Sequence, residues 1–219
     1  MRCDKKAMLL YAITDRAWTG KQTLYEQVED ALKGGVTCVQ LREKNQLREK
    51  NLGDEEFLKE AREIGALCRK YGVPFIVNDN VEAAIACHAD GIHVGQEDME
   101  AGKVRTLAGD DMIIGVSVHT VEEALKAVES GADYLCLGSV FPTSTKLDVD
   151  LMPENTLKAI CNAVDLPVVA IGGINKNNLP LLAGTGVDGA ALVSAIFSAD
   201  NIEEACRELR SLSEAMVQA

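Results

Sequence analysis

Long hydrophobic runs are what this sequence most clearly lacks. No segment approaches the roughly 18 to 20 consecutive apolar residues that a membrane-spanning helix needs. The apolar run 8–13 follows Lys5 and Lys6, as a signal-peptide core would, but it is short, and Asp15 and Arg16 follow it without a small-residue cleavage site. We therefore predict a buried strand at this run, and neither a membrane span nor a leader.

The sequence is also short of positive charge. Its 219 residues include 22 Lys and Arg against 34 Asp and Glu, which gives a formal net charge of −12. This balance argues against binding nucleic acid through a basic field. If the ligand is an anion, the cationic side chains that hold it must be clustered at its binding site, because the net charge of the protein is negative. The apolar fraction of 47% and the charged fraction of 26% are those of an ordinary globular protein.

Several motifs with defined chemistry are absent as well. The seven cysteines are scattered and odd in number, and no C-x-x-C occurs. This pattern favours free thiols in a reducing compartment, and so a cytoplasmic protein, over disulfides or zinc. Cys38 and Cys136 lie inside apolar runs, where a small buried residue is expected. The Walker A, G-x-G-x-x-G and G-x-S-x-G motifs are missing too, and no spacing of Cys, His and Asp indicates a covalent nucleophile.

Short apolar runs alternate with longer amphipathic segments along the whole chain. Strands that alternate with helices form right-handed crossovers and a parallel sheet, and eight such units in 219 residues fit a closed barrel better than an open sheet. We therefore predict one (β/α)8 TIM-barrel domain over residues 1–219. The expected strands are 9–13, 37–41, 75–78, 91–94, 112–116, 134–137, 168–171 and 189–193. The expected helices are 24–33, 55–71, 81–88, 101–108, 121–130, 154–163, 179–184 and 202–217.

A short motif recurs where a predicted helix gives way to the next strand. It reads G-V-T from Gly35, G-A-D from Gly131 and G-V-D from Gly186, and H-A-D from His88 occupies a similar place. Glycine is common just after a helix end because it adopts a left-handed backbone conformation without strain. We interpret the motif as a repeated joint between helix and strand, not as a domain boundary.

The hexapeptide Q-L-R-E-K-N occurs twice in succession, at 40–45 and at 46–51. Only the first copy continues an apolar strand, so we assign it to the strand end and the second copy to an enlarged loop. A shift of six residues preserves which side chains face each side of a strand. The second copy therefore stays an alternative.

Functional groups of such barrels lie at the carboxyl ends of the strands and in the loops that follow. After the second strand, Gln40, Arg42 and Lys44 occupy alternate positions and share a face. Together they offer an amide and two cations to an anion, and the alternative is a solvated charged loop.

Two carboxylates follow neighbouring strands. Asp79 comes after the third strand, beside Asn78, and Asp98 comes after the fourth. Mg²⁺ takes oxygen ligands and commonly shares its shell with substrate phosphates, so a magnesium site is one interpretation. Helix N-caps are the other, since Asp is favoured there. His93, inside a strand, is interpreted as a packed and hydrogen-bonded residue.

Hydroxyls and glycines follow the later strands. Ser117 is either a turn hydroxyl or a ligand contact, whereas Thr120, with Glu123 three residues on, is interpreted as a capping box. The segment after the sixth strand is either an anion cradle or a polar surface loop; it contains Thr143, Ser144, Thr145 and Lys146. Gly172-Gly173 and Val193-Ser194 follow the last two strands, the recurring phosphate site of these barrels. Two anion sites at one rim indicate two phosphorylated ligands, or one with phosphates at both ends.

Together these segments resemble the thiamine phosphate synthase family over nearly the whole chain. The segments that carry the resemblance are YAITD at 11–15, VQLREK at 39–44, PFIVND at 74–79, GIHVGQED at 91–98, IGVS at 114–117, FPTSTK at 141–146, VAIGGI at 169–174 and VSAIF at 193–197. The resemblance implies a transferase with Mg²⁺ as its cofactor. It would join 4-amino-2-methyl-5-hydroxymethylpyrimidine diphosphate to a carboxylated thiazole phosphate, giving thiamine phosphate, pyrophosphate and CO₂.

The resemblance also implies a role for each candidate residue. The pyrimidine diphosphate would be held by Gln40, Arg42, Lys44, Asn78, Ser117 and Lys146, with Leu41 and Glu43 of the same motif at the substrate site. Thr143, Ser144, Thr145, Gly173, Val193 and Ser194 would line the thiazole phosphate site, and Asp79 and Asp98 would hold Mg²⁺. The catalytic candidates are Arg42, Lys44, Ser117 and Lys146. Neutralised pyrophosphate would leave in a dissociative substitution, and the thiazole nitrogen, already a free base, would attack without a general base.

The duplicated hexapeptide and Ser144, which stands where the family often has proline, depart from the family pattern. Two alternatives stay open: a thiazole tautomerase relative, which would need only the thiazole phosphate half, and a non-catalytic sensor of a phosphorylated ligand. The residues suited to pyrophosphate and Mg²⁺ favour the synthase. The expected partners are two phosphorylated small molecules, with no nucleic acid and no membrane. A homo-oligomer is left open, because the sequence does not show the oligomeric state.

Overall fold

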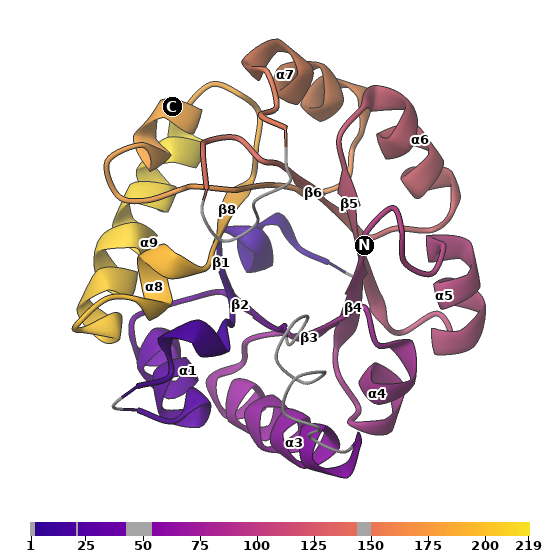
Figure 1. Ribbon diagram of the computed structural model, residues 1–219. Helices are drawn as coiled ribbons and strands as arrows, with labels where there is room; N and C mark the ends of the chain where they lie inside the picture. Colours follow the sequence, from indigo (N-terminus) through magenta and orange to yellow (C-terminus); the bar gives the residue numbers. More distant parts are fainter. Residues whose placement is uncertain (1–2, 21, 43–53, 144–149) are drawn as a thin grey trace.

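The computed structural model describes residues 3–20, 22–42, 54–143 and 150–219. Eight strands close into a barrel in the order in which they occur in the sequence, each parallel to its neighbours (Figure 1). The predicted TIM barrel is therefore confirmed. The strands are β1 (Leu10–Ile13), β2 (Cys38–Leu41), β3 (Phe75–Asn78), β4 (Gly91–Val94), β5 (Ile113–Val118), β6 (Tyr134–Leu137), β7 (Val168–Ile171) and β8 (Gly189–Leu192).

Helices surround the barrel, as Figure 1 shows. They are α1 (Leu24–Lys33), α3 (Asp54–Tyr71), α4 (Val81–Ala86), α5 (Ala101–Ala108), α6 (Val121–Glu129), α7 (Glu154–Ala163), α8 (Ser194–Phe197) and α9 (Ile202–Gln218), with the 3₁₀ helices η1 (Lys5–Met8), η2 (Arg16–Trp18) and η3 (Leu179–Leu182). Several predicted bounds shift by one or two residues, the helix predicted at 81–88 ends at Ala86, and α8 was not predicted. Two further predictions need correction. The strand predicted from the run 8–13 begins only at Leu10, because Met8 ends η1, and the α-helix expected at 179–184 is the short η3.

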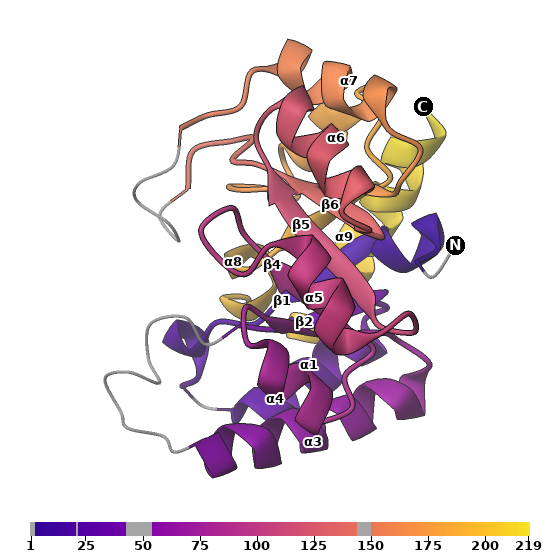
Figure 2. The ribbon, with the colours of Figure 1, turned by 90° about the vertical axis from the view of Figure 1, so that its right-hand side faces the viewer.

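Strand residues face alternately the helices and the barrel interior, and they form two separate cores. The larger core lies between strands and helices and includes Leu10, Val39 and Val77. The smaller one fills the barrel and includes Tyr11 and Tyr134. Cys38 and Cys136 belong to this inner core, as expected of small buried residues, and Cys3 and Met8 of the N-terminal segment join it. Figure 2 shows the N-terminus at one end of the barrel and α8 at the other.

The recurring sequence motif forms a hydrogen-bonded joint before each even-numbered strand. Thr37, Asp90, Asp133 and Asp188 each accept a hydrogen bond from a backbone N–H of the preceding strand, over 2.8–2.9 Å. Each also donates its own backbone N–H to a carbonyl of that strand. Two residues earlier the backbone is left-handed every time, with φ between 55° at His88 and 93° at Gly35 and Gly186. The predicted joint is thus a clamp between neighbouring strands.

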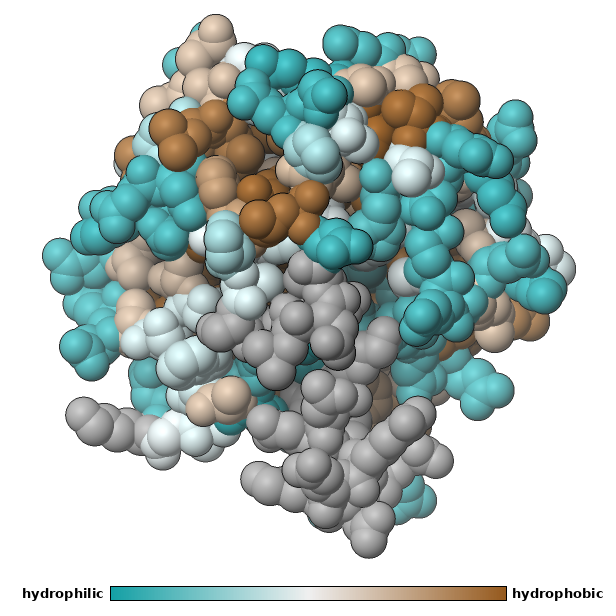
Figure 3. Space-filling view, turned by 45° about the horizontal axis from the view of Figure 1, so that its top comes forward, coloured by the Kyte–Doolittle hydropathy of each residue, from teal (hydrophilic) through white to brown (hydrophobic). Residues whose placement is uncertain are grey.

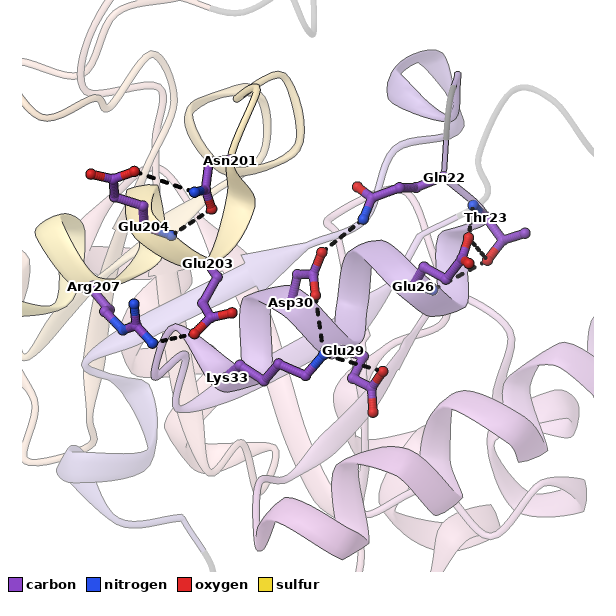
Figure 4. Close-up of polar contacts among 10 residues, drawn as sticks. All are labelled: Gln22, Thr23, Glu26, Glu29, Asp30, Lys33, Asn201, Glu203, Glu204 and Arg207. Atoms are coloured by element: carbon purple, nitrogen blue, oxygen red, sulfur yellow. Dashed lines mark hydrogen bonds and ion pairs between the residues drawn. The ribbon is translucent and has the colours of Figure 1, made fainter.

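The last helix, α9, closes the ring of helices against α1. Arg210 donates to the carbonyl oxygen of Gly35 over 2.9 Å, and a Cβ added to Gly34 would lie 2.4 Å from the Cβ of Cys206. Both helices begin with a side-chain cap (Figure 4): Thr23 and Glu26 form a reciprocal capping box at α1, and Asn201 accepts from the backbone of Glu204 at α9. These caps satisfy amide groups that have no partner within the helix.

Hydrophilic side chains cover much of the face shown in Figure 3, and hydrophobic ones form separate patches between them. In the part of the chain that the structure describes, none of the helices combines the length and the hydrophobicity needed to span a membrane. All seven cysteines lie in this part and are free thiols, and burial raises the pKa of the Cys136 thiol to about 12.

Two of the carboxylates in these clamps, Asp133 and Asp188, form ion pairs with different cations, and this difference gives a test. Asp133 pairs over 2.6 Å with Arg105, and both side chains are largely buried. Asp188 pairs with Lys5, whose side chain is 56% exposed. We expect Asp133→Ala to lower the free energy of unfolding by about 3 kcal/mol, because it leaves the Arg105 charge buried without its partner. Asp188→Ala, the matched control, should cost about half as much. Urea denaturation measures both, and equal losses would contradict the role given to Arg105.

Candidate active site

The barrel interior contains a continuous polar network below the carboxyl ends of the strands. Gln40 donates from Nε2 to the hydroxyl of Tyr11 over 2.8 Å, and this hydroxyl lies 2.8 Å from that of Tyr134. The Tyr134 hydroxyl lies 2.9 Å from Nδ1 of His93, and Nε2 of His93 lies 2.9 Å from Oγ of Ser117. This polar network, formed by Gln40, Tyr11, Tyr134, His93 and Ser117, connects β2 to β5 across the barrel.

The two tyrosine rings fix the middle of the polar network. Their centroids are 5.9 Å apart in an edge-to-face arrangement, and the ring of His93 lies 5.6 Å from that of Tyr134. Burial raises the pKa of Tyr11 and of Tyr134 well above the ordinary value for tyrosine, so both hydroxyls keep their protons at neutral pH. Gly115 makes room for this arrangement, because a Cβ at that position would lie 2.0 Å from Cζ of Tyr134.

Asp79 is not a helix cap, so one of the two interpretations left open by the sequence is removed. The cap of α4 is Asn80, whose side chain accepts from the backbone N–H of Ala83 over 2.9 Å. Asp79 precedes it with φ of 59°, a left-handed conformation that few residues other than glycine adopt. Its backbone N–H donates to the carbonyl oxygen of His93 over 2.8 Å, which ties the loop after β3 to the end of β4.

Asp98 does not cap a helix either. The residue before α5 is Glu100, and Asp98 lies two positions earlier. One oxygen of Asp98 accepts from the backbone N–H of Gly95 over 2.9 Å, which folds the loop after β4 back on itself. Asp79 and Asp98 thus lie in loops that follow the neighbouring strands β3 and β4. Two carboxylates that are not helix caps suit a hard cation, which completes its shell with water and substrate oxygens. Among the residues with described positions, no group of three or more His, Cys, Asp or Glu is arranged to hold a metal ion.

The first copy of the duplicated hexapeptide forms the end of β2, as predicted. Gln40 faces the barrel interior and is 2% exposed, whereas Leu41 packs into the outer core against the helices, so its side chain does not point toward the mouth. The backbone N–H of Arg42 donates to the hydroxyl of Thr14 over 3.0 Å. Glu43 and Lys44 of this copy, and the whole second copy, lie outside the described residues.

The loops after β6 and β7 pack against one another. Val140 and Phe141 donate their backbone N–H groups to the carbonyl oxygens of Ile171 and Gly172. Gly173 has φ of 63°, and a Cβ there would lie 2.2 Å from the carbonyl oxygen of Pro142. The structure therefore brings the loop that leads to Thr143 beside Gly173. Ser144, Thr145 and Lys146 lie outside the described residues.

The end of β8 leads directly into a short helix. Val193 is the residue before α8, and Ser194 is its first residue. Both side chains are partly buried, and Val193 packs against the inner core. The first amide groups of a helix have no partner within it, so this end of α8 is suited to an anion.

Some residues of the site were not singled out from the sequence. Tyr11 and Tyr134 lie in apolar strands, and the signal for them is that a buried tyrosine hydroxyl needs a partner. His93 is packed and hydrogen-bonded, as predicted. Thr120 caps α6, as expected, but the carboxylate of Glu123 accepts from the backbone of His119, so the reciprocal half of the predicted capping box is absent.

Comparison with known proteins places these features in a family. Residues 10–196 match the model of a family described as thiamine monophosphate synthase. The chain belongs to this family. It is 46% identical over 200 residues to the thiamine-phosphate synthase of Clostridium tetani, covering 91% of this chain and 93% of that one. It is 45% identical over 200 residues to the enzyme of the same name from Clostridioides difficile, covering 91% and 92%.

A solved structure gives the same result. The thiamine phosphate pyrophosphorylase from Pyrococcus furiosus superposes with a TM-score of 0.87 at 40% identity, covering 97% of this chain and 98% of that one. Family membership over most of its length makes the chain a thiamine-phosphate synthase, a transferase of thiamine biosynthesis. The predicted family and activity are therefore confirmed.

The reassignment of the α4 cap predicts different outcomes for two adjacent residues. Asn80→Ala should lower the free energy of unfolding by about 1 kcal/mol, because it removes the acceptor for the Ala83 amide. Asp79→Asn should leave stability within about 0.5 kcal/mol, because asparagine also tolerates a left-handed backbone. Chemical denaturation measures both. A larger loss for Asp79→Asn than for Asn80→Ala would mean that Asp79 stabilises the helix end after all.

Proposed function

We propose that the carboxyl end of the barrel joins 4-amino-2-methyl-5-hydroxymethylpyrimidine diphosphate to a thiazole phosphate, which carries a carboxylate lost as CO₂. The observation that carries this proposal is the position of Arg42, Asp79 and Asp98, which follow the three neighbouring strands β2, β3 and β4 at one rim. A diphosphate bound there would meet a guanidinium on one side and a carboxylate-bound cation on the other.

The pyrimidine diphosphate would bind on the β2–β5 side of the mouth. Gln40 and Ser117, at the two ends of the polar network, would contact it together with Asn78, the last residue of β3. Arg42 would neutralise charge on the departing pyrophosphate, a task that we also assign to Lys44 and Lys146, outside the described residues. Positive charge next to the departing pyrophosphate stabilises the negative charge that develops there and so accelerates the substitution. The thiazole nitrogen needs no general base.

Asp79 and Asp98 are the residues that would hold Mg²⁺. Their fit rests on the donor set: two carboxylates in adjacent loops, neither used as a helix cap. When bound, this cation would supply Lewis acidity toward the diphosphate oxygens. Asp79 is held in place by its backbone bond to His93, and Asp98 by its bond to Gly95.

The thiazole phosphate would bind on the opposite side, between the ends of β6, β7 and β8. Gly173, Thr143, Val193 and Ser194 would line its phosphate site, with Ser144 and Thr145 outside the described residues. The left-handed conformation of Gly173 and the first amide groups of α8 support this assignment, because both favour a close approach of backbone N–H groups to an anion.

We further propose that residues 1–219 form one domain and that the protein acts in the cytoplasm. The seven free thiols support a reducing compartment. The net charge of −12 argues against nucleic acid as a partner, and we propose small phosphorylated molecules, held by groups gathered at the mouth, as the partners.

A coupling assay tests the proposed reaction. Incubation of both phosphorylated substrates with Mg²⁺ should give thiamine phosphate and pyrophosphate in equal amounts, measured by chromatography and a pyrophosphate assay. Isomerisation of the thiazole without coupling would instead identify a tautomerase. Binding of the thiazole phosphate without any turnover would identify a sensor.

The proposed metal ligands give a sharper prediction. Asp98→Asn keeps an acceptor for the Gly95 amide but removes a charged oxygen ligand, so the Mg²⁺ concentration for half-maximal rate should rise at least about tenfold. Glu97→Gln, which removes an exposed carboxylate from the same loop, is the matched control and should leave it unchanged. Magnesium titrations of the initial rate measure both. An unchanged requirement in Asp98→Asn would remove this residue from the metal site.

A further inference from the structure

The polar network also determines which group donates in each of its hydrogen bonds, because each hydrogen can take part in only one bond. A tyrosine hydroxyl has one hydrogen to donate, and a neutral histidine has one N–H. The Tyr11 hydroxyl already accepts from Gln40, so the buried hydrogen of Tyr11 finds its partner in the Tyr134 oxygen. The hydrogen of Tyr134 is then left to donate to Nδ1 of His93. With Nδ1 as the acceptor, the hydrogen of neutral His93 lies on Nε2 and is donated to Ser117.

Any other arrangement with the same Gln40 orientation leaves a buried hydroxyl hydrogen with a poor acceptor or with none. If Tyr134 donated to Tyr11, the hydrogen of Tyr11 would have only the sulfur of Cys38, a weak acceptor. If Tyr11 still donated to Tyr134 while His93 donated from Nδ1, the hydrogen of Tyr134 would have no acceptor. An unsatisfied buried donor costs more than an ordinary hydrogen bond contributes, and both tyrosines are fully buried. The hydrogen bonds of the polar network therefore all run in one direction, from β2 toward β5.

We propose that Tyr11, Tyr134 and His93 are positioning residues that set the hydrogen-bonding character of Gln40 and Ser117 toward the substrate. With Nε2 of Gln40 held by Tyr11, its carbonyl oxygen is presented as an acceptor. With Oγ of Ser117 accepting from His93, its O–H is presented as a donor. The two ends of the network are coupled, because reversal at the Ser117 end alone leaves the hydrogen of Tyr11 to the weak sulfur acceptor of Cys38.

This polarity selects a class of substrate, and here the inference rests on the proposed function. A ligand between these ends must offer a hydrogen-bond donor to Gln40 and an acceptor to Ser117. A pyrimidine with an amino group carries both, since the amino group donates and the ring nitrogens accept. A pyrimidine without the amino group lacks the donor, and a site with buried polar groups discriminates strongly against such an analogue. The network would thus contribute to selection for the aminopyrimidine.

The first test compares the amino and des-amino pyrimidine diphosphates as substrates of the full-length protein. Tyr134→Phe keeps the ring but breaks the network in its middle, so the ratio of the two kcat/KM values should fall about tenfold. The KM for the thiazole phosphate should stay within about twofold. Tyr11→Phe should give the same fall, and the double variant should be no worse than either single one, because the network is already broken. Tyr71→Phe, a partly buried tyrosine at the end of α3, is the control.

The outcomes separate this inference from the function it rests on. Wild-type protein that forms no thiamine phosphate overturns the proposed reaction, and the inference with it. Wild-type protein that is active, with an unchanged substrate ratio in both tyrosine variants, overturns the inference alone. Thermal melting is measured alongside, since a purely structural network would lower the melting temperature and leave the ratio as it was.

A second measurement is made on the wild-type protein, and variants serve only to assign its resonances. Nitrogen-15 NMR of the imidazole groups distinguishes the two neutral tautomers, and the resonances of His93 are assigned by comparison with His88→Gln and His119→Gln proteins. We expect neutral His93 to carry its hydrogen on Nε2. A hydrogen on Nδ1 would reverse the direction of the network and overturn the proposal.

Discussion

The clamp that joins each even-numbered strand to the strand before it is the interaction on which the rest of the structure depends. Thr37, Asp90, Asp133 and Asp188 each accept from one backbone amide of the preceding strand and donate to a carbonyl oxygen of the same strand. A one-residue slip of any pair would move every side chain of a strand to its other face. By fixing the register at the amino end, the clamps decide which residues face the interior and so reach the mouth.

The barrel interior shows what this register makes possible. A row of polar groups across a core is costly unless each one finds a partner, and aliphatic residues would fill the same space with less risk. Here the register sets Gly115 opposite Tyr134, and the missing Cβ leaves room for the ring. Tyr134 can then lie between Tyr11 and His93. This polar interior is stable only because its hydrogen bonds are made, and these bonds hold the side chains of Gln40 and Ser117 in fixed orientations below the mouth.

The architecture can be predicted from the sequence, whereas the hydrogen-bond partners within the site cannot. Eight apolar runs and a repeated joint motif predict the barrel, because each depends only on neighbouring residues. The contact between Tyr11 and Tyr134 spans 123 positions and exists only once the barrel is closed. At 78–80 the sequence N-D-N contains three residues that could each cap the helix α4. The left-handed backbone of Asp79 excludes this residue from the cap position, which Asn80 occupies. The α-helix expected at 179–184 is only the short η3, a segment of four residues that contains Pro180.

In the proposed site, the charge of the protein affects the two sides of the mouth differently. With a net charge of −12, long-range attraction does not gather a diphosphate, and Asp79 and Asp98 at the rim would repel it further. A divalent cation held by these carboxylates, as proposed, would cancel their two negative charges and offer open coordination positions to diphosphate oxygens, so the β3–β4 loops would attract the diphosphate only when the metal is present. The phosphate site proposed on the β7–β8 side would need no such cation, because backbone amides attract an anion without any formal charge. If the two substrates bind as proposed, loss of Mg²⁺ would weaken binding of the pyrimidine diphosphate far more than binding of the thiazole phosphate.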